Sequence, residues 1–319
     1  MTDGPVTATA LPMTVPAPGL PEAVTIYEVG PRDGLQNEAG VIPLEMKVDF
    51  IERLVAVGLP VVEATSFVHP TWVPQLADAD QVLESLAHRG AVPDSVPLPV
   101  LVPNERGLDR ALALGVRHIA VFGSATETFA QRNLNRDLEG QFAMFEPTVR
   151  RALAEAMDVR GYLSMCFGDP WEGAVPIEQV VRVGVRLLEM GCYELSLGDT
   201  IGVGTTGHVT ALLDAFNAAG VGDDRLAVHF HDTYGQALAN ASAALRHGVT
   251  TFDASAGGLG GCPYAKSATG NLATGDLVWM LDGLGVRTGV DLRALAETSR
   301  WMAGHLGRPS PSRVVTALS

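Results

Sequence analysis

Cysteine is scarce in this sequence, and the three that occur are Cys166, Cys192 and Cys262. An odd, sparse set in a chain of this size excludes a disulfide framework and indicates a reducing compartment, so a cytoplasmic location is expected. No apolar run reaches the roughly 18 residues that a membrane helix needs. The N-terminus shows neither the basic and apolar regions of a signal peptide nor an Arg-rich transit pattern. We therefore expect a protein with no membrane segment.

Basic residues are also few. Lys and Arg together number 22 against 36 acidic residues, and Lys47 and Lys266 are the only lysines. The net charge of −14 argues against nucleic acid as a partner, because nucleic-acid binding requires a basic surface. It does not exclude a small anionic ligand, since a local group of arginines can outweigh a distant negative surface.

The chain divides into a tail and one domain. Residues 1–22 are rich in Pro, Ala, Thr and Gly, which predicts a flexible tail before a domain over residues 23–319. Eight short apolar runs follow, at residues 24–29, 61–65, 98–102, 118–122, 161–165, 193–197, 226–230 and 250–254. They are continuous rather than alternating, as expected for strands that are buried on both faces.

Amphipathic stretches separate the apolar runs. The stretch from Val209 to Phe216 places apolar residues at the i, i+3, i+4, i+7 spacing of a helix. Another ends at Gly58, and glycine is common just beyond a helix C-terminus. Eight alternating strand and helix units predict a (β/α)8 TIM barrel in the α/β class, with a doubly wound parallel sheet as the alternative. The segment from Asp291 onward predicts extra C-terminal helices.

The C-terminal ends of barrel strands are where TIM-barrel chemistry gathers, which narrows the search for a site. His229 and His231 end the seventh run, and residues i and i+2 of a strand point to the same side. An isolated His-x-His pair is more often one packed and one exposed histidine. Here Asp33, which follows the first run, adds a carboxylate. Two imidazoles with oxygen ligands suit Mg²⁺, Mn²⁺, Co²⁺ or Zn²⁺, so we predict a metal site.

Two further charged residues lie at this end of the predicted barrel. Arg32 places a permanent positive charge beside Asp33, where it can stabilise a developing enolate. The alternative is a salt bridge that only holds the loop. Gly30 and Gly34 flank the Pro-Arg-Asp triplet and favour the functional interpretation, because glycine lets backbone approach a ligand. Glu63 lies in an apolar run and needs a partner. The sequence leaves open whether it orients a metal-bound group, acts as a base or pairs with Arg32.

Cys262 follows four glycines within five residues, in a loop that is expected to be mobile and to close over a site. Its thiol can act as a general acid only with a tuned pKa. An inert small residue is an equally good interpretation on local grounds. Cys166 and Cys192 lie in strand contexts and are expected to be structural.

Five long segments resemble the hydroxymethylglutaryl-CoA lyases. They are YEVGPRDGLQNE, VVEATSFV, MGCYELSLGDTIGVGT, AVHFHDTYGQALAN and GGLGGCPYAKSATGNLATGDLVWMLDGLG, in the family's order, from Tyr27 to about Gly289. The family belongs to a larger group of metal-dependent TIM-barrel lyases and Claisen-type synthases. The resemblance implies cleavage of 3-hydroxy-3-methylglutaryl-CoA to acetyl-CoA and acetoacetate, a carbon–carbon lyase reaction of leucine breakdown and ketone-body formation. It also implies a homodimer.

The resemblance further implies residue roles. Asp33, His229, His231 and Asn271 match metal ligands, and the expected metal is Mg²⁺ or Mn²⁺, with Co²⁺ or Zn²⁺ as alternatives. Arg32 matches the arginine that stabilises the enolate, and Glu63 a carboxylate beside the metal. His229 is also implicated in proton transfer, and Cys262 matches the cysteine of the catalytic loop. The acyl-CoA substrate is expected to contact a set of strand-end residues: Gln36, Ser66, Ser196, Asp199 and Thr200.

One position departs from the family pattern. The family commonly continues Asn-Leu-Ala-Thr-Glu-Asp, whereas this chain has Gly275 in place of the glutamate. We expect that a carboxylate near the metal, or among the groups that surround its ligands, is therefore missing, and the loss of such a surrounding group typically costs about 10–100-fold in metal affinity or activity. The long targeting segment of the mitochondrial relatives is also absent, which agrees with a cytoplasmic location.

Three alternatives to this activity remain at the sequence level. The first is a lyase with the same chemistry that cleaves a longer 3-hydroxy-3-alkylglutaryl-CoA, which would require only a wider pocket. A Claisen-type synthase is less favoured, because such relatives usually carry a further C-terminal region. A non-catalytic metal- or CoA-binding protein is disfavoured because the whole set of candidate residues is intact: Arg32, Asp33, Glu63, His229, His231 and Cys262.

Overall fold

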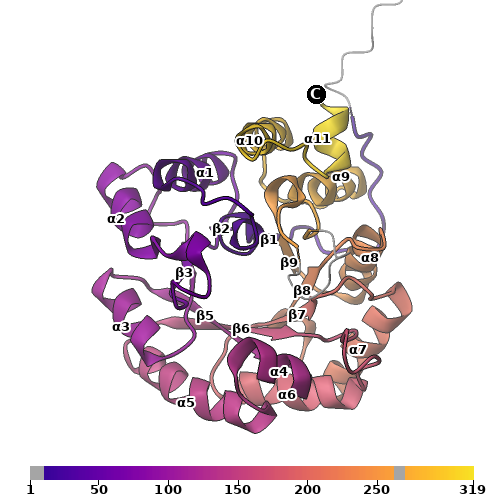
Figure 1. The fold of residues 1–319 in the computed structure, drawn as a ribbon. Helices are drawn as coiled ribbons and strands as arrows, with labels where there is room; N and C mark the ends of the chain where they lie inside the picture. The colour runs from indigo at the N-terminus through magenta and orange to yellow at the C-terminus, as the bar shows by residue number, and fades with distance from the viewer. Residues whose placement is uncertain (1–10, 262–269) are drawn as a thin grey trace, which may run out of the picture.

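The computed structural model describes residues 11–261 and 270–319, and in these ranges nine parallel strands form one sheet (Figure 1). The spatial order is β2, β1, β9, β8, β7, β6, β5, β4 and β3. β2 and β3 are two halves of one strand, interrupted at Glu63 and Ala64. The Glu63 amide donates to the Glu28 carbonyl oxygen, and the Ala64 amide to that of Pro99, both at 2.9 Å. The sheet therefore closes on itself. The predicted (β/α)8 barrel is confirmed, and the doubly wound alternative is wrong.

The strands agree with the eight apolar runs. They are β1 (Thr25–Glu28), β2 (Val61–Val62), β3 (Thr65–Ser66), β4 (Val100–Leu101), β5 (His118–Ser124), β6 (Asp158–Ser164), β7 (Leu195–Asp199), β8 (Leu226–Phe230) and β9 (Thr251–Ala254). The largest difference is at β6, which begins at Asp158 rather than at residue 161. It extends this far because β5 pairs with it from His118 onward, including charged positions that an apolar pattern does not detect.

Helices surround the strands on the outside of the barrel (Figure 1). They are α1 (Leu44–Ala56), α2 (Ala79–Arg89), α3 (Glu105–Ala113), α4 (Glu127–Leu134), α5 (Leu138–Ala154), α6 (Ile177–Glu189), α7 (Thr206–Ala218), α8 (Ala237–His247), α9 (Thr274–Leu284), α10 (Leu292–His305) and α11 (Arg313–Ala317). Short helical turns are η2 (Gly30–Gly34), η3 (Pro74–Leu76), η4 (Asp223–Arg225) and η5 (Ala256–Gly258). Gly58, beyond α1, has φ +92°, as its predicted position after the helix requires.

The outer helices press closely on the barrel. On α6, Gly184 faces the strands, and a Cβ built there would lie 2.7 Å from atoms of Leu195 and Phe216. Any larger residue would push α6 away from β7. Among the described residues, no helix is both long enough and apolar enough to cross a bilayer.

Both ends of the described chain lie against the last barrel helix. Within the segment predicted as a tail, the Val15 amide donates to the Gly283 carbonyl oxygen at 2.8 Å, and Thr14 Oγ1 donates to that of Asp282. The predicted C-terminal helices are α10 and α11, and Val315 of α11 is buried.

Candidate active site

Arg32 and Asp33 lie on η2, a single π-helical turn that follows β1. The amides of Asp33 and Gly34 both donate to the Val29 carbonyl oxygen, at 2.8 and 3.0 Å. A Cβ on Gly30 would lie 2.5 Å from Glu28 Oε1, and one on Gly34 would lie 2.8 Å from an oxygen of the loop after β9. The flanking glycines thus let protein segments approach each other. The predicted approach of this backbone to a ligand stays a prediction.

Asp33, His229 and His231 converge at the carboxyl ends of β1 and β8. One ligand atom from each lies within 4.8 Å of the others. His229 Nε2 is 3.9 Å from Asp33 Oδ2, and the two imidazole centroids are 5.4 Å apart, so the histidines share one side as predicted. Burial and the neighbouring His229 lower the pKa of His231 to about 4, which keeps its imidazole neutral, the form that binds metal ions.

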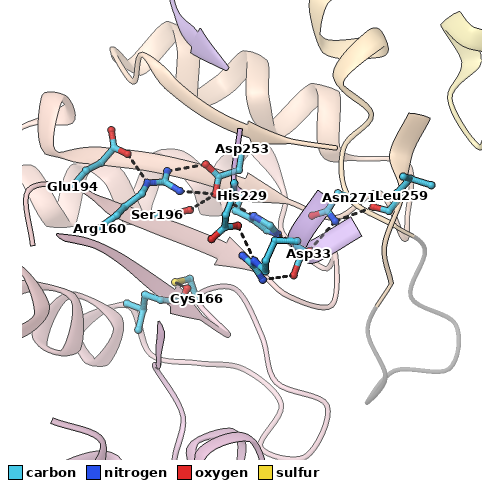
Figure 2. A network of polar contacts seen from close by, with 12 residues as sticks. Asp33, Arg160, Cys166, Glu194, Ser196, His229, Asp253, Leu259 and Asn271 are labelled. Atoms are coloured by element: carbon cyan, nitrogen blue, oxygen red, sulfur yellow. Dashed lines mark hydrogen bonds and ion pairs between the residues drawn. The ribbon is translucent and has the colours of Figure 1, made fainter. Parts of the chain in front are cut away.

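Asn271 completes this group. Its Nδ2 donates to Asp33 Oδ2 at 2.9 Å and to the Leu259 carbonyl oxygen at 3.0 Å (Figure 2). Within residues 11–261 and 270–319, its Oδ1 is buried without a hydrogen-bond partner, and so is Nδ1 of His231. Buried polar atoms normally have partners. Two nitrogen donors and at least two oxygen donors, with such atoms free, fit a divalent cation.

Arg32 lies beside this group and is buried. Its Nη1 donates to Asp33 Oδ1 at 2.8 Å, and its Nε donates to Glu63 Oε2 at 2.7 Å. Burial raises the pKa of Glu63, and the Arg32 charge offsets only part of that rise. Burial by itself would also raise the pKa of Asp33. The charges of Arg32 and the two histidines outweigh this effect and lower the pKa of that carboxyl. Of the three roles left open for Glu63, the geometry shows the pairing with Arg32.

A buried chain of charges lies behind His229, and the sequence analysis missed it (Figure 2). Asp253 Oδ2 lies 3.2 Å from His229 Nδ1, and Asp253 receives two hydrogen bonds from the Arg160 guanidinium, at 2.7 and 3.2 Å. Arg160 Nε also donates to Glu194 Oε2 at 2.7 Å. Burial by itself would raise the pKa of Asp253, but Arg160 and His229 outweigh it and lower that pKa to about 2. The sequence did carry a signal for Asp253, because it is a charged residue inside an apolar run. The same signal drew attention to Glu63.

The residues expected to contact substrate make specific protein contacts. Ser196 Oγ donates to Asp253 Oδ2 at 2.7 Å, and Asp199 accepts the amides of residues 203 and 204 at 2.9 Å. Thr200 Oγ1 accepts the Met165 amide at 2.8 Å, and Ser66 Oγ donates to the Leu101 carbonyl oxygen at 3.3 Å. Gln36 follows Leu35, the C-cap residue of η2, and its side chain is half-buried. Their contact with substrate stays a prediction.

Two of the three cysteines are buried in the barrel, as expected for structural residues. Cys166 and Cys192 are fully buried, and Cys166 Sγ donates to the Leu163 carbonyl oxygen at 3.1 Å. Burial raises the pKa of the Cys192 thiol to about 12. Cys262, expected in the catalytic loop, lies outside the described residues.

The structure places Gly275 beside the C-terminal helices. A Cβ at this position would be nearest to Ser312, Leu292 and Val314, at 3.7–3.9 Å, all in or next to the C-terminal helices. The next residue, Asp276, accepts a hydrogen bond from Ser312 Oγ at 2.6 Å. The first turn of α9 therefore faces α11 at this position. A side chain at this position would start towards the C-terminal helices, and the expected effect of the glycine on metal binding stays a prediction.

Glu28 at the end of β1 connects three segments of the site. Its carboxylate accepts the Gly30 amide at 2.9 Å, and the Ala256 amide and Thr274 Oγ1 at 2.7 Å each. These donors begin η2, η5 and α9. Glu28 is fully buried, and burial raises its pKa from 4.5 to about 7, against the effect of the three hydrogen bonds.

The pKa of Glu28 predicts a pH effect on stability. Between about pH 4.5 and 7 the folded protein holds a proton that the unfolded chain has released, so the free energy of unfolding falls as pH rises through this window, by up to about 3 kcal/mol. Urea unfolding of the metal-free protein at pH 5 and pH 7.5 measures it. Glu28→Gln should remove this contribution, and an unchanged pH dependence in the variant would contradict the assignment.

A closed parallel barrel with two histidines, a carboxylate and a buried arginine at its strand ends is a TIM barrel with a candidate metal site at the mouth where such enzymes carry out their chemistry. The chain belongs to the HMGL-like family, whose sequence model matches residues 23–302. Lyases of this family depend on a divalent metal, and Asp33, His229 and His231 are its candidate site here.

Several known proteins are similar to this chain. The mitochondrial hydroxymethylglutaryl-CoA lyase of Arabidopsis thaliana is 50% identical over 94% of the chain, which spans 63% of that protein's length. The mitochondrial enzyme of Rattus norvegicus is 49% identical over 93% of the chain and 90% of its own length. The crystal structure of the hydroxymethylglutaryl-CoA lyase from Pseudomonas aeruginosa superimposes with a TM-score of 0.89 at 45% identity, covering 94% of this chain and 98% of that one.

Proposed function

We propose that this chain cleaves 3-hydroxy-3-methylglutaryl-CoA to acetyl-CoA and acetoacetate, with Mg²⁺ or Mn²⁺ at Asp33, His229, His231 and Asn271. The convergence of the three ionisable ligands beside the buried Arg32 carries this proposal. The names of the relatives support the substrate. A homodimer in the cytoplasm, acting in leucine breakdown, is the setting we propose with it.

The chain's own residues account for the steps of a retro-Claisen cleavage. A bound divalent cation would supply Lewis-acid polarisation of the substrate's C3 hydroxyl. Asp33 or His229 removes the hydroxyl proton, and C3 becomes the ketone of acetoacetate as the C2–C3 bond breaks. The electron pair of that bond passes into the thioester enolate, whose negative charge the Arg32 guanidinium stabilises. Cys262 or a neighbouring group returns a proton to C2 and completes acetyl-CoA.

Metal dependence of acetoacetate release tests this proposal. We expect the purified protein, after chelation, to release no acetoacetate from the CoA thioester and to recover when Mg²⁺ or Mn²⁺ is added. His231→Gln should abolish recovery, because a ligand is lost, whereas His88→Gln on the exposed face of α2 should recover as wild type does. If folded, metal-loaded wild type releases no product, the substrate is wrong, and longer 3-hydroxy-3-alkylglutaryl-CoA thioesters are the next assay.

A further inference from the structure

The C-terminal segment 308–312, between α10 and α11, contacts two loops of the candidate site. Arg308 forms an ion pair with Glu38, in the loop that continues from Asp33. Ser310 Oγ donates a hydrogen bond to the Gly257 carbonyl oxygen at 2.8 Å. Gly257 lies in η5, directly after β9. One short segment far along the chain therefore holds both the loop after β1 and the loop after β9.

The segment packs directly on the backbone of the second loop. Gly257 and Gly258 have φ values of +70° and +71°. A Cβ on Gly257 would lie 3.2 Å from Ser310 Oγ, and one on Gly258 would lie 3.0 Å from Pro311 Cγ. This spacing leaves little room for the loop to shift towards the C-terminal segment, so the segment defines where the loop lies.

The position of this loop determines the orientation of Asn271. Both hydrogens of the Asn271 amide group are used, one on the Leu259 carbonyl oxygen and one on Asp33 Oδ2. Gly260 approaches the same amide nitrogen, and a Cβ there would lie 2.5 Å from it. Asn271 Oδ1 is consequently left as the free end of the amide, buried and, in the part of the chain that the structure describes, without a hydrogen-bond partner. A displacement of Leu259 would rotate the amide and remove that oxygen from the ligand set.

The two loops are also connected to each other. Asn37 Nδ2 donates to the Gly261 carbonyl oxygen at 2.8 Å. The contact at Glu38 and the contact at Gly257 therefore act on a single unit that carries Asp33 on one side and supports Asn271 on the other.

We propose that Arg308 and Ser310 are positioning residues for the metal site, acting through Glu38 and Gly257 on the geometry of Asp33 and Asn271. The inference rests on the metal site proposed above. A purely structural role, the packing of α11 against α9, is the alternative. That alternative would lower thermal stability without changing the affinity for metal.

Mn²⁺ binding separates these two roles. In the full-length protein, Arg308→Gln combined with Ser310→Ala should weaken Mn²⁺ binding about tenfold, the change expected from losing two partly exposed polar contacts. Titration of free Mn²⁺ by its EPR signal measures the affinity, and a thermal melt on the same sample reports stability. At saturating Mn²⁺ we expect kcat to stay within about twofold of wild type, because no group that touches substrate changes.

Two further variants complete the experiment. Arg313→Gln, an exposed position on α11, is the matched control and should bind Mn²⁺ as wild type does. Ser310→Ala alone should weaken binding about threefold, and it keeps the test valid if the double variant folds poorly. Wild-type affinity in both Ser310 variants overturns the inference. Wild-type protein that fails to bind Mn²⁺ overturns the proposed metal site, and this inference with it.

Discussion

Arg32→Gln should lower kcat for cleavage of the substrate's C2–C3 bond about 10²–10³-fold, the loss typical of a group that stabilises a developing oxyanion. The guanidinium is buried and is held on two sides, by Glu63 at 2.7 Å and Asp33 at 2.8 Å. It is therefore already oriented before reaction and need not reorganise as charge develops. Glutamine keeps a hydrogen-bond donor of similar shape but removes the positive charge.

The variant also leaves Glu63 buried without its cation, and this second effect must be separated from the first. An unpaired buried carboxylate destabilises the fold or takes up a proton. Arg32→Gln combined with Glu63→Gln removes that carboxylate. If the loss of activity came only from the orphaned Glu63, the double variant would recover, and we expect that it does not.

Steady-state kinetics at saturating Mn²⁺, with Mn²⁺ affinity measured in parallel, is the test for Arg32. Arg89→Gln is the matched control, because Arg89 forms ion pairs between α1 and α2 on the surface. That variant should keep wild-type kcat. A kcat close to wild type in Arg32→Gln would show that the arginine only holds the loop.

The barrel was predictable because its strands are buried on both faces. Most strands therefore appear in the sequence as short, largely apolar runs, and the runs alternate with stretches of helical spacing. The convergence of Asp33 with His229 and His231 followed from the fold, since the strand ends of a barrel meet at one mouth. No distance between strands was needed for that step.

The support behind these residues was not predictable by the same means. His229 and Asp253 are register partners on neighbouring strands β8 and β9, a relation that depends on the pairing of the sheet. Arg160 reaches Asp253 from β6 across the barrel interior, where inward-facing side chains from separate strands meet. The orientation of Gly275 towards α11 depends on where the chain returns after α10. Sequence spacing contains neither kind of information.

Asp253→Asn should both destabilise the protein and weaken metal binding. Breaking a buried ion pair by removing one partner costs about 3–5 kcal/mol, because Arg160 keeps its charge with only Glu194 opposite. The carboxylate that holds His229 Nδ1 is lost as well. Loss of such a carboxylate–histidine contact typically lowers metal affinity about 10–100-fold. Urea unfolding of the metal-free protein and Mn²⁺ titration measure the two effects.

Glu194→Gln is the matched control that separates the two effects of Asp253. Both acids pair with Arg160, at 2.7 Å each. Of the two, only Asp253 contacts His229 in the part of the chain that the structure describes. Glu194→Gln should therefore lower the free energy of unfolding while leaving Mn²⁺ affinity within about twofold of wild type. If Asp253→Asn and Glu194→Gln lost Mn²⁺ affinity equally, the effect would come from the disturbed packing around Arg160 and not from the contact with His229. A loss confined to Asp253→Asn would assign the effect to the hydrogen bond that orients His229.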